Sequence, residues 1–487
     1  NDTRRCDTGP MARRTKIIAT IGPASDSEGM IKDLAEAGMD VARIGLAHGT
    51  LDEAIEKFRR VRRVEASLGR PLGVMVDLPG PKVRAGTMPE GGLAVSQGEM
   101  IRLTPGADGS TPAAIRVDHE GLLADLHVGD RVTFGDGAVM AQVEERNADH
   151  LVARVTHGGL LQGRPGVHIP SDRLRIPSPT PEDLHMLDAF VEEGIDMVAL
   201  SFVRSAHDVR RVGVEPHPRG PLVIAKIETR AAVDNLDSII EASGAVMIAR
   251  GDLGAELPIE ELPHLQKRIL QRCIALGRPA ITATQMLESM VTAPSPTRAE
   301  ASDIANAVFD GSSALMLSGE SAIGRDPVNA VATMARIAAR ADDEFDYDAW
   351  GARVHAMATT MQPNIDDTVT NAMTMAAWRA ASESGASAII CITRTGFTVR
   401  AIARFRPQAK ILGFSADPQT LRQIKLSWGA TPHDLGVDYH DEHVISHVLS
   451  VAREAGDIRR GDLVCVLSGS SEYPGQATDS LQLIPIR

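Results

Sequence analysis

Two stretches, LVIAKIE (222–228) and AVMIARGDLG (245–254), join short apolar runs to charged residues. Side chains alternate along a strand, so residues two apart leave from the same face. The spacing therefore predicts that Lys226 lies beside Glu228, and that Arg250 and Asp252 repeat this arrangement one strand later. Carboxylate oxygens suit magnesium or manganese, and nearby cations stabilise a phosphoryl group during transfer. The pattern predicts phosphate chemistry on a divalent metal.

Apolar runs of this kind recur along the chain and alternate with amphipathic segments long enough for helices. The predicted strands are 16–20, 41–44, 72–77, 197–202, 222–227, 245–249, 279–284 and 313–317. Eight strand and helix units predict an α/β fold based on a (β/α)8 TIM barrel. In such a barrel the residues that follow each strand meet at one face and build the site, so Arg43, Asp77, Ser201 and Thr284 are expected there together with the charged pairs.

Two regions interrupt the alternation. Residues 87–171 are rich in glycine, valine and turn signals, which predicts a small β domain inserted after the third barrel strand. Beyond a boundary near 345–365, three buried-type strands separated by helices predict a C-terminal α/β domain. The predicted organisation is an N-terminal tail at 1–14, barrel segments at 15–86 and 172–345, the insertion at 87–171 and the C-terminal domain at 346–487. Met11, within the tail, is a candidate second start of translation.

Composition and charge exclude several classes of function. No apolar run approaches the roughly 18 residues of a membrane span, and we expect no secretory signal because the first residues lack an apolar stretch. The formal net charge of −13 argues against nucleic acid as a main partner, since phosphate backbones attract basic surfaces. Four cysteines without metal or redox spacing fit a cytoplasmic protein.

Seven motifs follow one another along the chain: TKIIATIGPAS, EAGMDVARI, KIET, ARGDLGAELP, ATQMLESM, PTRAEASDIANAV and LMLSGESA. In this order and spacing they resemble the pyruvate kinase family along almost the whole chain. The resemblance implies a barrel, a mobile β-barrel lid in the place of residues 87–171, a C-terminal effector domain and a homotetramer. It also implies transfer of the phosphoryl group of phosphoenolpyruvate to ADP, leaving an enolate that is protonated to pyruvate.

Further roles follow from the resemblance, residue by residue. Glu228 and Asp252 match divalent-metal ligands, Lys226 matches the lysine that stabilises the transferring phosphoryl group, and Arg43 matches a phosphate-binding arginine. Such a transition state needs positioning and charge neutralisation more than a covalent nucleophile. The structural alternative for Lys226 and Glu228 is a buried ion pair.

Other matches concern the two substrates. Gly251 and Asp252 match the backbone amides that hold the substrate carboxylate, aided by Thr284, which also lies near the path of the proton. His48 and Arg84 match contacts on the nucleotide side, and Arg164 stands where the lid offers a basic residue. A turn residue at Thr284, a loop histidine at His48 and a solvated arginine at Arg164 are the simpler alternatives.

The chain departs from the family where potassium-dependent members bind that ion. Their side-chain oxygens are replaced by Gly45, Ala47 and Leu78, so only Asp77 remains. Lys82 stands where those members hold a glutamate, and a tethered ammonium there replaces the charge of the ion, as in the potassium-independent branch. We therefore expect no potassium requirement; an exposed loop lysine is the alternative. In the lid, Gly135-Asp136-Gly137 lacks one of the family's paired acids.

An effector site is predicted in the C-terminal domain, where CITRTGFTVRAIARF indicates a strand, a loop and a helix. Hydroxyls and amides of Thr393, Arg394, Thr395, Gly396 and Thr398 are suited to a phosphate, and the family uses the matching loop for phosphorylated effectors. An ordinary helix cap explains these residues equally well. Because Glu472 in a second loop repels a second phosphate, we expect a sugar monophosphate or AMP to bind better than fructose 1,6-bisphosphate.

Two other functions remain open from the sequence. One is a metal-dependent aldolase or decarboxylase on the same barrel, since Glu228 and Asp252 on a metal would serve any enolate. Such an enzyme does not need Lys226 together with Arg43 and Arg84. The other is a weakly active paralogue that senses metabolites through its C-terminal domain.

Overall fold

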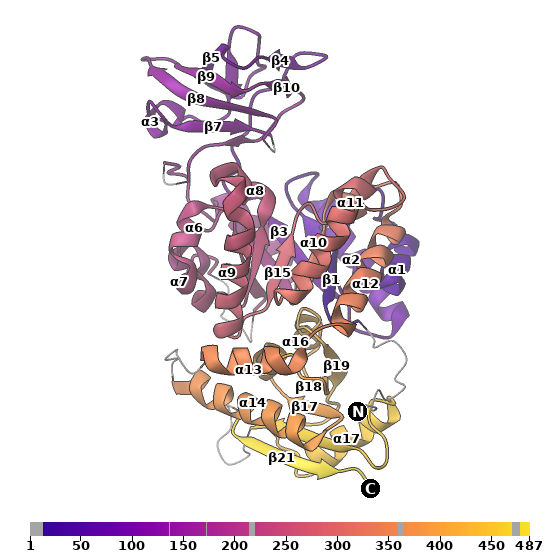
Figure 1. The fold of residues 1–487 in the computed structure, drawn as a ribbon. Helices are drawn as coiled ribbons and strands as arrows, with labels where there is room; N and C mark the ends of the chain where they lie inside the picture. The colour runs from indigo at the N-terminus through magenta and orange to yellow at the C-terminus, as the bar shows by residue number, and fades with distance from the viewer. Residues whose placement is uncertain (1–12, 136, 172, 214–219, 359–364, 470–477) are drawn as a thin grey trace.

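Three bodies stand in a row in the computed structural model, which describes residues 13–135, 137–171, 173–213, 220–358, 365–469 and 478–487. A small sheet domain lies at one end, a barrel in the middle and an α/β domain at the other end (Figure 1). The predicted fold class is therefore confirmed. Among the described residues, no helix has the length and apolar character needed to cross a membrane.

The barrel is a closed ring of parallel strands in the order β1-β16-β15-β14-β13-β12-β3-β2. Its strands are β1 Lys16–Thr20, β2 Val41–Gly45, β3 Gly73–Leu78, β12 Met197–Leu200, β13 Leu222–Ile227, β14 Ala245–Ala249, β15 Ala280–Ala283 and β16 Ala314–Leu317. All eight agree with the predicted strands within two residues at each end. Buried apolar residues fill both the ring and the layer between ring and helices.

Strand alternation explains why the polar residues gather at one end of the ring. Met75, Ala199 and Ile224 belong to the apolar cluster inside the barrel. Residues two positions further along each strand face the same way. The next inward side chains, towards the carboxyl ends, are therefore Asp77 on β3, Ser201 after β12 and Lys226 on β13.

Helices surround the ring. Helix α2 begins with a capping box in which Thr50 and Glu53 bond each other's backbone N–H groups, and it ends at Gly69 in the left-handed conformation that favours glycine. The helices of this layer are α1 Glu28–Ala37, α2 Leu51–Leu68, α4 Pro181–Glu192, α5 Ala206–Arg210, α6 Arg230–Asp234, α7 Leu236–Ala242, α8 Arg250–Glu256, α9 Leu262–Ala275, α10 Arg298–Phe309, α11 Gly319–Ala322 and α12 Pro327–Asp343.

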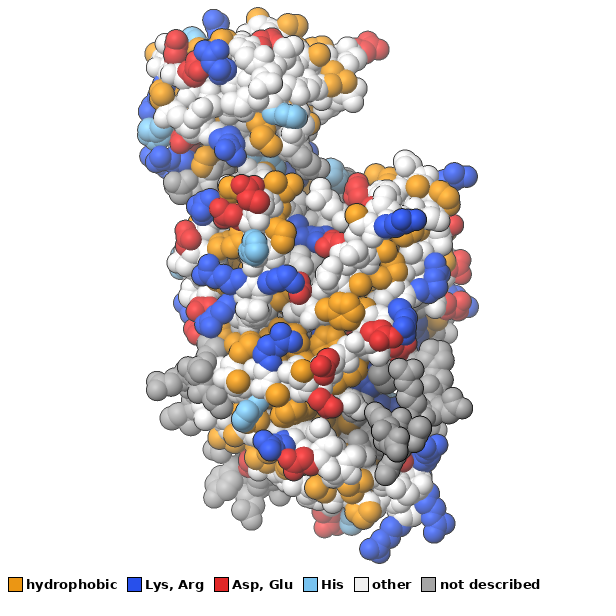
Figure 2. All heavy atoms as spheres, in the orientation of Figure 1, with side chains coloured by type: hydrophobic (Ala, Val, Ile, Leu, Met, Phe, Trp, Pro, Cys, Tyr) orange, Lys and Arg blue, Asp and Glu red, His pale blue; other side chains and the backbone are white. Residues whose placement is uncertain are grey.

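The small sheet domain has its own apolar core, which includes Leu103, Phe134 and Val143. A six-stranded sheet has the order β11-β7-β8-β9-β5-β6, and β4 pairs with β10 in a second sheet. The elements are β4 Leu93–Val95, β5 Met100–Pro105, β6 Ile115–Val117, α3 Leu122–Asp125, β7 Arg131–Phe134, β8 Val139–Arg146, β9 Leu151–His157, β10 Gly159–Leu161 and β11 Val167–His168. In the space-filling view, a notch separates this domain from part of the barrel (Figure 2).

The C-terminal domain is a five-stranded sheet in the order β19-β18-β17-β20-β21 with helices packed against it. Three of its strands were predicted; β19 and β21 were missed because they are polar or exposed and lack a buried run. The elements are α13 Tyr347–Ala358, α14 Ile365–Ser384, β17 Ala388–Ile392, α15 Phe397–Ala403, β18 Lys410–Ser415, α16 Pro418–Ile424, β19 Ala430–Asp434, α17 Val444–Glu454, β20 Leu463–Ser468 and β21 Ser480–Pro485.

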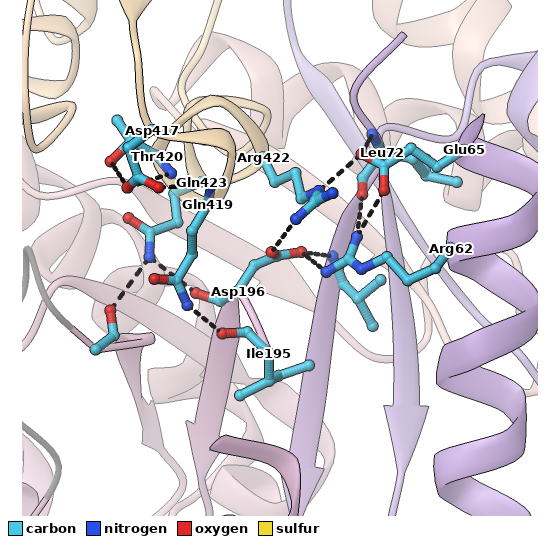
Figure 3. A network of polar contacts seen from close by, with 12 residues as sticks. Arg62, Glu65, Leu72, Ile195, Asp196, Asp417, Gln419, Thr420, Arg422 and Gln423 are labelled. Carbon is cyan, nitrogen blue, oxygen red and sulfur yellow. Dashed lines mark hydrogen bonds and ion pairs between the residues drawn. The ribbon is translucent and has the colours of Figure 1, made fainter. Parts of the chain in front are cut away.

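Helix α16 joins this domain to the base of the barrel (Figure 3). The Gln419 amide donates to the carbonyl of Ile195 at 2.6 Å, and the Gln423 amide donates to that of Asp196 at 3.1 Å. Arg422 donates to Glu65 at 2.8 Å. Leu426, just after the helix, belongs to the apolar cluster inside the barrel. The C-terminal domain thus closes the end of the barrel opposite the polar cluster.

Candidate active site

Lys226 is the centre of the polar cluster at the carboxyl ends of the strands. Its ammonium lies 2.9 Å from Glu228 Oε1, 3.1 Å from Asp77 Oδ1 and 2.8 Å from Ser201 Oγ. Burial alone would lower the pKa of Lys226, but the carboxylates of Asp77 and Glu228 outweigh it and raise this pKa above its ordinary value. The lysine therefore stays charged. The predicted Lys226–Glu228 neighbourhood is present.

Asp77 ties a second cation to this cluster. Arg43 Nε donates to Asp77 Oδ2 at 2.8 Å, and Nη1 of the same guanidinium donates to Thr20 Oγ1 at 2.9 Å. Burial would raise the pKa of Asp77, but the charges of Lys226 and Arg43 overcome burial and hold this pKa below its ordinary value. One buried carboxylate thus fixes both cations, one through each oxygen.

Glu228 and Asp252 supply oxygens suited to a divalent cation. Glu228 is buried, and its Oε2 accepts a hydrogen bond from the Phe202 amide at 2.7 Å. Asp252 lies in the first turn of α8 with its side chain 28% exposed, and His168 Nε2 lies 3.8 Å from its Oδ1. Burial raises the pKa of Glu228, Lys226 opposes this, and the charge of Asp252 raises it further. A hard cation between the two carboxylates would relieve that repulsion, so the pair fits magnesium or manganese.

The described residues contain no cluster of three or more histidine, cysteine or acidic residues that alone could hold a metal. Two protein carboxylates with the remaining positions left to water and substrate are typical of Mg²⁺ bound beside phosphates. The pair therefore suits a metal that binds together with its substrate.

The expectation for Arg250 is wrong. Strand β14 ends at Ala249, and Arg250 begins helix α8, so it does not share a strand face with Asp252. Its guanidinium instead donates to Asp303 at 2.7 Å and to the carbonyl of Thr284 at 2.7 Å. The second cation of the cluster is Arg43.

Thr284 and Gly251 lie together beside Asp252. Thr284 has φ +66°, in the left-handed region that is rare for residues other than glycine. The Gly251 amide donates to Thr284 Oγ1 at 2.9 Å, and this hydroxyl donates to the carbonyl of Ala283 at 2.7 Å. A substrate carboxylate at the Gly251 amide would thus have to share or replace the threonine hydroxyl. Strain at a threonine of this kind is frequent at ligand sites.

Three other basic residues, His48, Lys82 and Arg84, lie near Arg43 at the mouth of the barrel. Partial burial and the positive charges of Arg84, Lys82 and Arg43 lower the pKa of His48 below its ordinary value. Lys82 is exposed and lines a hollow together with Gly166 and His168 of the small sheet domain. Positive charge therefore gathers locally on an acidic protein, as an anionic substrate requires.

Arg164 belongs to the small sheet domain rather than to the barrel cluster. Its guanidinium forms an ion pair with Asp118 at 3.0 Å, and its side chain is 44% exposed. Gly135 and Gly137 have φ +61° and +89°, whereas Asp136 between them lies outside the described residues.

The predicted effector loop is held by hydrogen bonds of its own. Thr393 Oγ1 accepts from the Gly396 amide at 3.0 Å, and Thr395 Oγ1 accepts from the Phe397 amide at 3.2 Å. Arg394 donates to His440 at 2.8 Å, and Thr398 Oγ1 lies 2.6 Å from Thr478 Oγ1. The N-cap residue of α15, Gly396, has no side-chain cap, and only the Thr395 bond reaches an amide of the first turn, so the capping alternative is met in part. The predicted role of Glu472 lies outside the described residues.

Sequence reasoning expected Asp77 and Ser201 at this face without assigning them contacts to the two cations, and it did not name Thr20. All three hold Lys226 or Arg43. Each lies in the last two residues of a barrel strand or directly after it. The position at the end of a strand, which singled out Arg43 and Lys226, would have found Thr20 too.

Comparisons with known proteins match this architecture throughout. A family model described as "Pyruvate kinase, barrel domain" matches residues 12–331, and one described as "Pyruvate kinase, alpha/beta domain" matches residues 371–484. The chain is 38% identical over 462 residues to a pyruvate kinase of Mycobacterium tuberculosis, covering 94% of this chain and 96% of that protein. It is 36% identical over 475 residues to one of Clostridium acetobutylicum, covering 97% and 99%. A solved pyruvate kinase from Cryptosporidium parvum superimposes with a TM-score of 0.88 at 32% identity, covering 98% and 96%.

Proposed function

Since the chain belongs to the pyruvate kinase family and is thereby a phosphotransferase, we propose that its barrel site transfers the phosphoryl group of phosphoenolpyruvate to ADP without a potassium requirement. The bond between the enol oxygen and phosphorus breaks, a bond from an ADP phosphate oxygen to phosphorus forms, and the enolate takes up a proton to give pyruvate. The carrying observation is Lys226, a buried ammonium held between Asp77, Ser201 and Glu228, whose carboxylates raise the pKa of the lysine.

Each residue of the cluster has a role that its surroundings support. Lys226 and Arg43 offer fixed positive charge to the phosphoryl group, which is the main requirement of this kind of transfer. Glu228 and Asp252 would hold magnesium or manganese, which neutralises phosphate charge when bound. Thr284 and the amides of Gly251 and Asp252 are proposed to hold the substrate carboxylate. His48, Arg84 and Arg164 are proposed contacts for ADP.

A coupled assay with phosphoenolpyruvate, ADP and magnesium tests the proposal. We expect ATP and pyruvate to form, EDTA to abolish the reaction, and Lys226→Met to lower kcat by several orders of magnitude, since it removes a charge that acts on the transition state. Arg459→Met, which changes a 90% exposed arginine far from the barrel mouth, serves as the matched control. Wild-type turnover in Lys226→Met would refute the assignment. Enolate chemistry without ATP formation would favour the aldolase or decarboxylase alternative.

Potassium independence rests on the absence of side-chain oxygens at Gly45, Ala47 and Leu78. We propose similar rates in potassium-free buffer and at about 0.1 M potassium, with ionic strength matched so that screening stays constant. One candidate for the substitute charge is Lys82, which is exposed at the barrel mouth; a sharp loss of activity in Lys82→Glu would support that role. A strong potassium requirement of the unmodified protein would contradict this.

A sugar monophosphate or AMP is proposed as effector at the loop of Thr393, Arg394, Thr395, Gly396 and Thr398. Calorimetry with these ligands and with fructose 1,6-bisphosphate tests it, with Thr395→Glu expected to abolish binding by charge repulsion. Tighter binding of the bisphosphate would overturn the preference for monophosphates, and no binding at all would leave the loop as a helix cap.

A homotetramer is proposed as the assembly. Support comes from β21, which forms an edge of the C-terminal sheet and exposes 47% of Leu483. Unpaired edge strands readily pair with another chain. Light scattering of the purified protein decides this, and a monomer would contradict it. The cytoplasm is the proposed location, supported by the free thiols of the buried Cys273, Cys391 and Cys465.

A further inference from the structure

Both oxygens of Asp77 are engaged by groups of the chain itself. Oδ1 accepts from Lys226 at 3.1 Å and from Ser201 at 3.4 Å, and Oδ2 accepts from Arg43 at 2.8 Å. Two fixed cations therefore face one buried carboxylate. A monovalent cation at Asp77 would meet like charge on both sides, and it would find no side-chain oxygen at positions 45, 47 or 78.

Gly45 explains how the arginine reaches this place. It lies directly opposite Asp77 in the pairing of β2 with β3. A Cβ at residue 45 would stand 3.7 Å from Arg43 Nη2 and 3.9 Å from its Cζ. A methyl group would thus be in ordinary contact, but a longer side chain starting there would enter the space of the guanidinium. The missing side chain leaves room beside Asp77, and the guanidinium fills it.

Other contacts hold the guanidinium in this position. Nη1 donates to Thr20 Oγ1, which in turn donates to the carbonyl of Leu317 at 2.8 Å. Lys82, by contrast, is exposed, and its Cε lies 3.4 Å from the position of a Cβ on Gly166 in the small sheet domain. The charges that shift the ionisation of Asp77 come from Lys226 and Arg43.

We propose that Asp77 is a positioning residue whose counter-ion is built into the chain: the Arg43 guanidinium, admitted by Gly45, takes the place beside Asp77 that a monovalent cation would otherwise hold. Through Asp77 it also fixes Lys226 at the reaction site. The role in catalysis rests on the proposed phosphoryl transfer, whereas the exclusion of an ion does not. Arg43 acts on the substrate and serves as the counter-ion at the same time.

The test compares two substitutions at one position. Gly45→Asn places a longer side chain in the guanidinium's space, and Gly45→Ala adds only a methyl in ordinary contact. Thermal unfolding is followed without substrate in 0.1 M KCl and in 0.1 M tetramethylammonium chloride, whose cation is too large for such a site. A cation that binds only the folded state raises the unfolding midpoint by mass action.

We expect the unmodified protein and Gly45→Ala to unfold within about 1 °C in the two salts, and Gly45→Asn to gain at least about 3 °C from potassium, because Asp77 then lacks its guanidinium. Steady-state kinetics adds a second readout. Gly45→Asn should raise KM for phosphoenolpyruvate at least about tenfold with a smaller fall in kcat, since a misplaced Arg43 weakens binding of the phosphate. Gly45→Ala should stay within about twofold of the unmodified protein in both constants.

Three outcomes would overturn the proposal: potassium stabilisation of the unmodified protein, an unchanged salt response in Gly45→Asn, or a salt response in Lys82→Glu where Gly45→Asn shows none. The last outcome would assign the substitute charge to Lys82. If Gly45→Asn does not fold, Arg43→Gln removes the same charge while keeping the backbone, and a gain of several degrees from potassium is again expected. Because unfolding is measured without substrate, failure of the proposed reaction and failure of this inference are distinguishable.

Discussion

The neighbouring strands β3 and β12 have a buried aspartate at each end of the barrel, Asp77 at the carboxyl ends and Asp196 at the amino ends. Each lies beside two cations, yet the pKa values of the two carboxylates shift in opposite directions. At the carboxyl ends, Asp77 lies between Lys226 and Arg43, and its pKa is held below the ordinary value. At the amino ends, Asp196 lies between Arg62 and Arg422 in the network of Figure 3. There burial outweighs the cations and raises the pKa of Asp196 to about 6.

The contacts account for the opposite signs. Cations stand 2.8 and 3.1 Å from the oxygens of Asp77, one on each oxygen. At Asp196, Arg62 and the Val74 amide both approach Oδ2, at 2.6 and 2.8 Å. Oδ1 is buried without a hydrogen-bond partner among the described residues, and Arg422 Nη1 lies 3.9 Å away. Burial is similar at both ends, so the second cation decides whether the charged form is stabilised.

The largest expected effect separates the two ends by activity. Asp77→Asn removes the carboxylate that fixes Lys226 and Arg43, so we expect kcat/KM for phosphoenolpyruvate to fall by about 10²-fold or more. Asp196→Asn makes the same chemical change at the amino ends and should cost less than about tenfold, because no group of the site touches it. Steady-state kinetics at saturating magnesium measures both. Equal losses would mean that Asp77 has only a structural role.

The contributions of Asp196 and Asp77 to stability should change in opposite directions as the pH falls. The folded state binds a proton at Asp196 between about pH 4 and 6 that the unfolded state does not, so the charged carboxylate is a cost at neutral pH that is relieved on acidification. At about 1.4 kcal/mol for each pKa unit, the protein should gain at most about 3 kcal/mol relative to Asp196→Asn as pH falls from 7 to 4.

Asp77 should behave in the reverse sense. Its lowered pKa means that stability is present at neutral pH and is lost as pH falls below about 4, through the folded value. Urea midpoints of the unmodified protein and of each Asn variant, taken across this range, give the two differences. Circular dichroism of the helices around the barrel gives these midpoints, because all three tryptophans lie in the C-terminal domain and their fluorescence would report that domain. A difference of the same sign for Asp77 and Asp196 would contradict the comparison.

Arg422 is expected to matter for stability more than for catalysis. Arg422→Met leaves Glu65 without its 2.8 Å donor and takes away the more distant cation of Asp196. We expect a loss of about 1 to 3 kcal/mol, less than for a fully buried pair because the side chain is 25% exposed. Arg459→Met, at a 90% exposed arginine 3.8 Å from its carboxylate, should cost less than about 0.5 kcal/mol. Denaturant midpoints measure both, and equal losses would argue against a special role of α16.

Local sequence patterns predicted most of the polar cluster at the carboxyl ends of the strands. Strand β13 continues to Ile227, so spacing by two placed Lys226 beside Glu228 as expected. The same rule failed for Arg250, since β14 ends at Ala249 and Arg250 begins helix α8, where its side chain donates to the carbonyls of Ala283 and Thr284 at the end of β15. That boundary depends on tertiary contacts that no local pattern encodes.

The polar network at the amino ends of the strands shows more clearly what local sequence patterns cannot predict. Arg62, Asp196 and Arg422 come from distant parts of the chain, and no spacing rule connects them. Packing within the barrel brings Arg62 to Asp196, and the packing of α16 against the barrel adds Arg422. The assignments of substrate, nucleotide and effector residues stay predictions.

The smallest effect is expected at the exposed pair of the small sheet domain. Arg164 and Asp118 lie 3.0 Å apart with side chains 44% and 49% exposed, so water screens their attraction and the pair contributes little to stability. Arg164→Met should change the unfolding midpoint by less than about 1 °C, in contrast to the buried pairs of the barrel. If Arg164 also contacts ADP, KM for ADP should rise about threefold while KM for phosphoenolpyruvate stays constant. An unchanged KM for ADP would leave Arg164 as a solvated residue, whereas a large loss of stability would mean that this exposed pair matters as much as the buried ion pairs of the barrel.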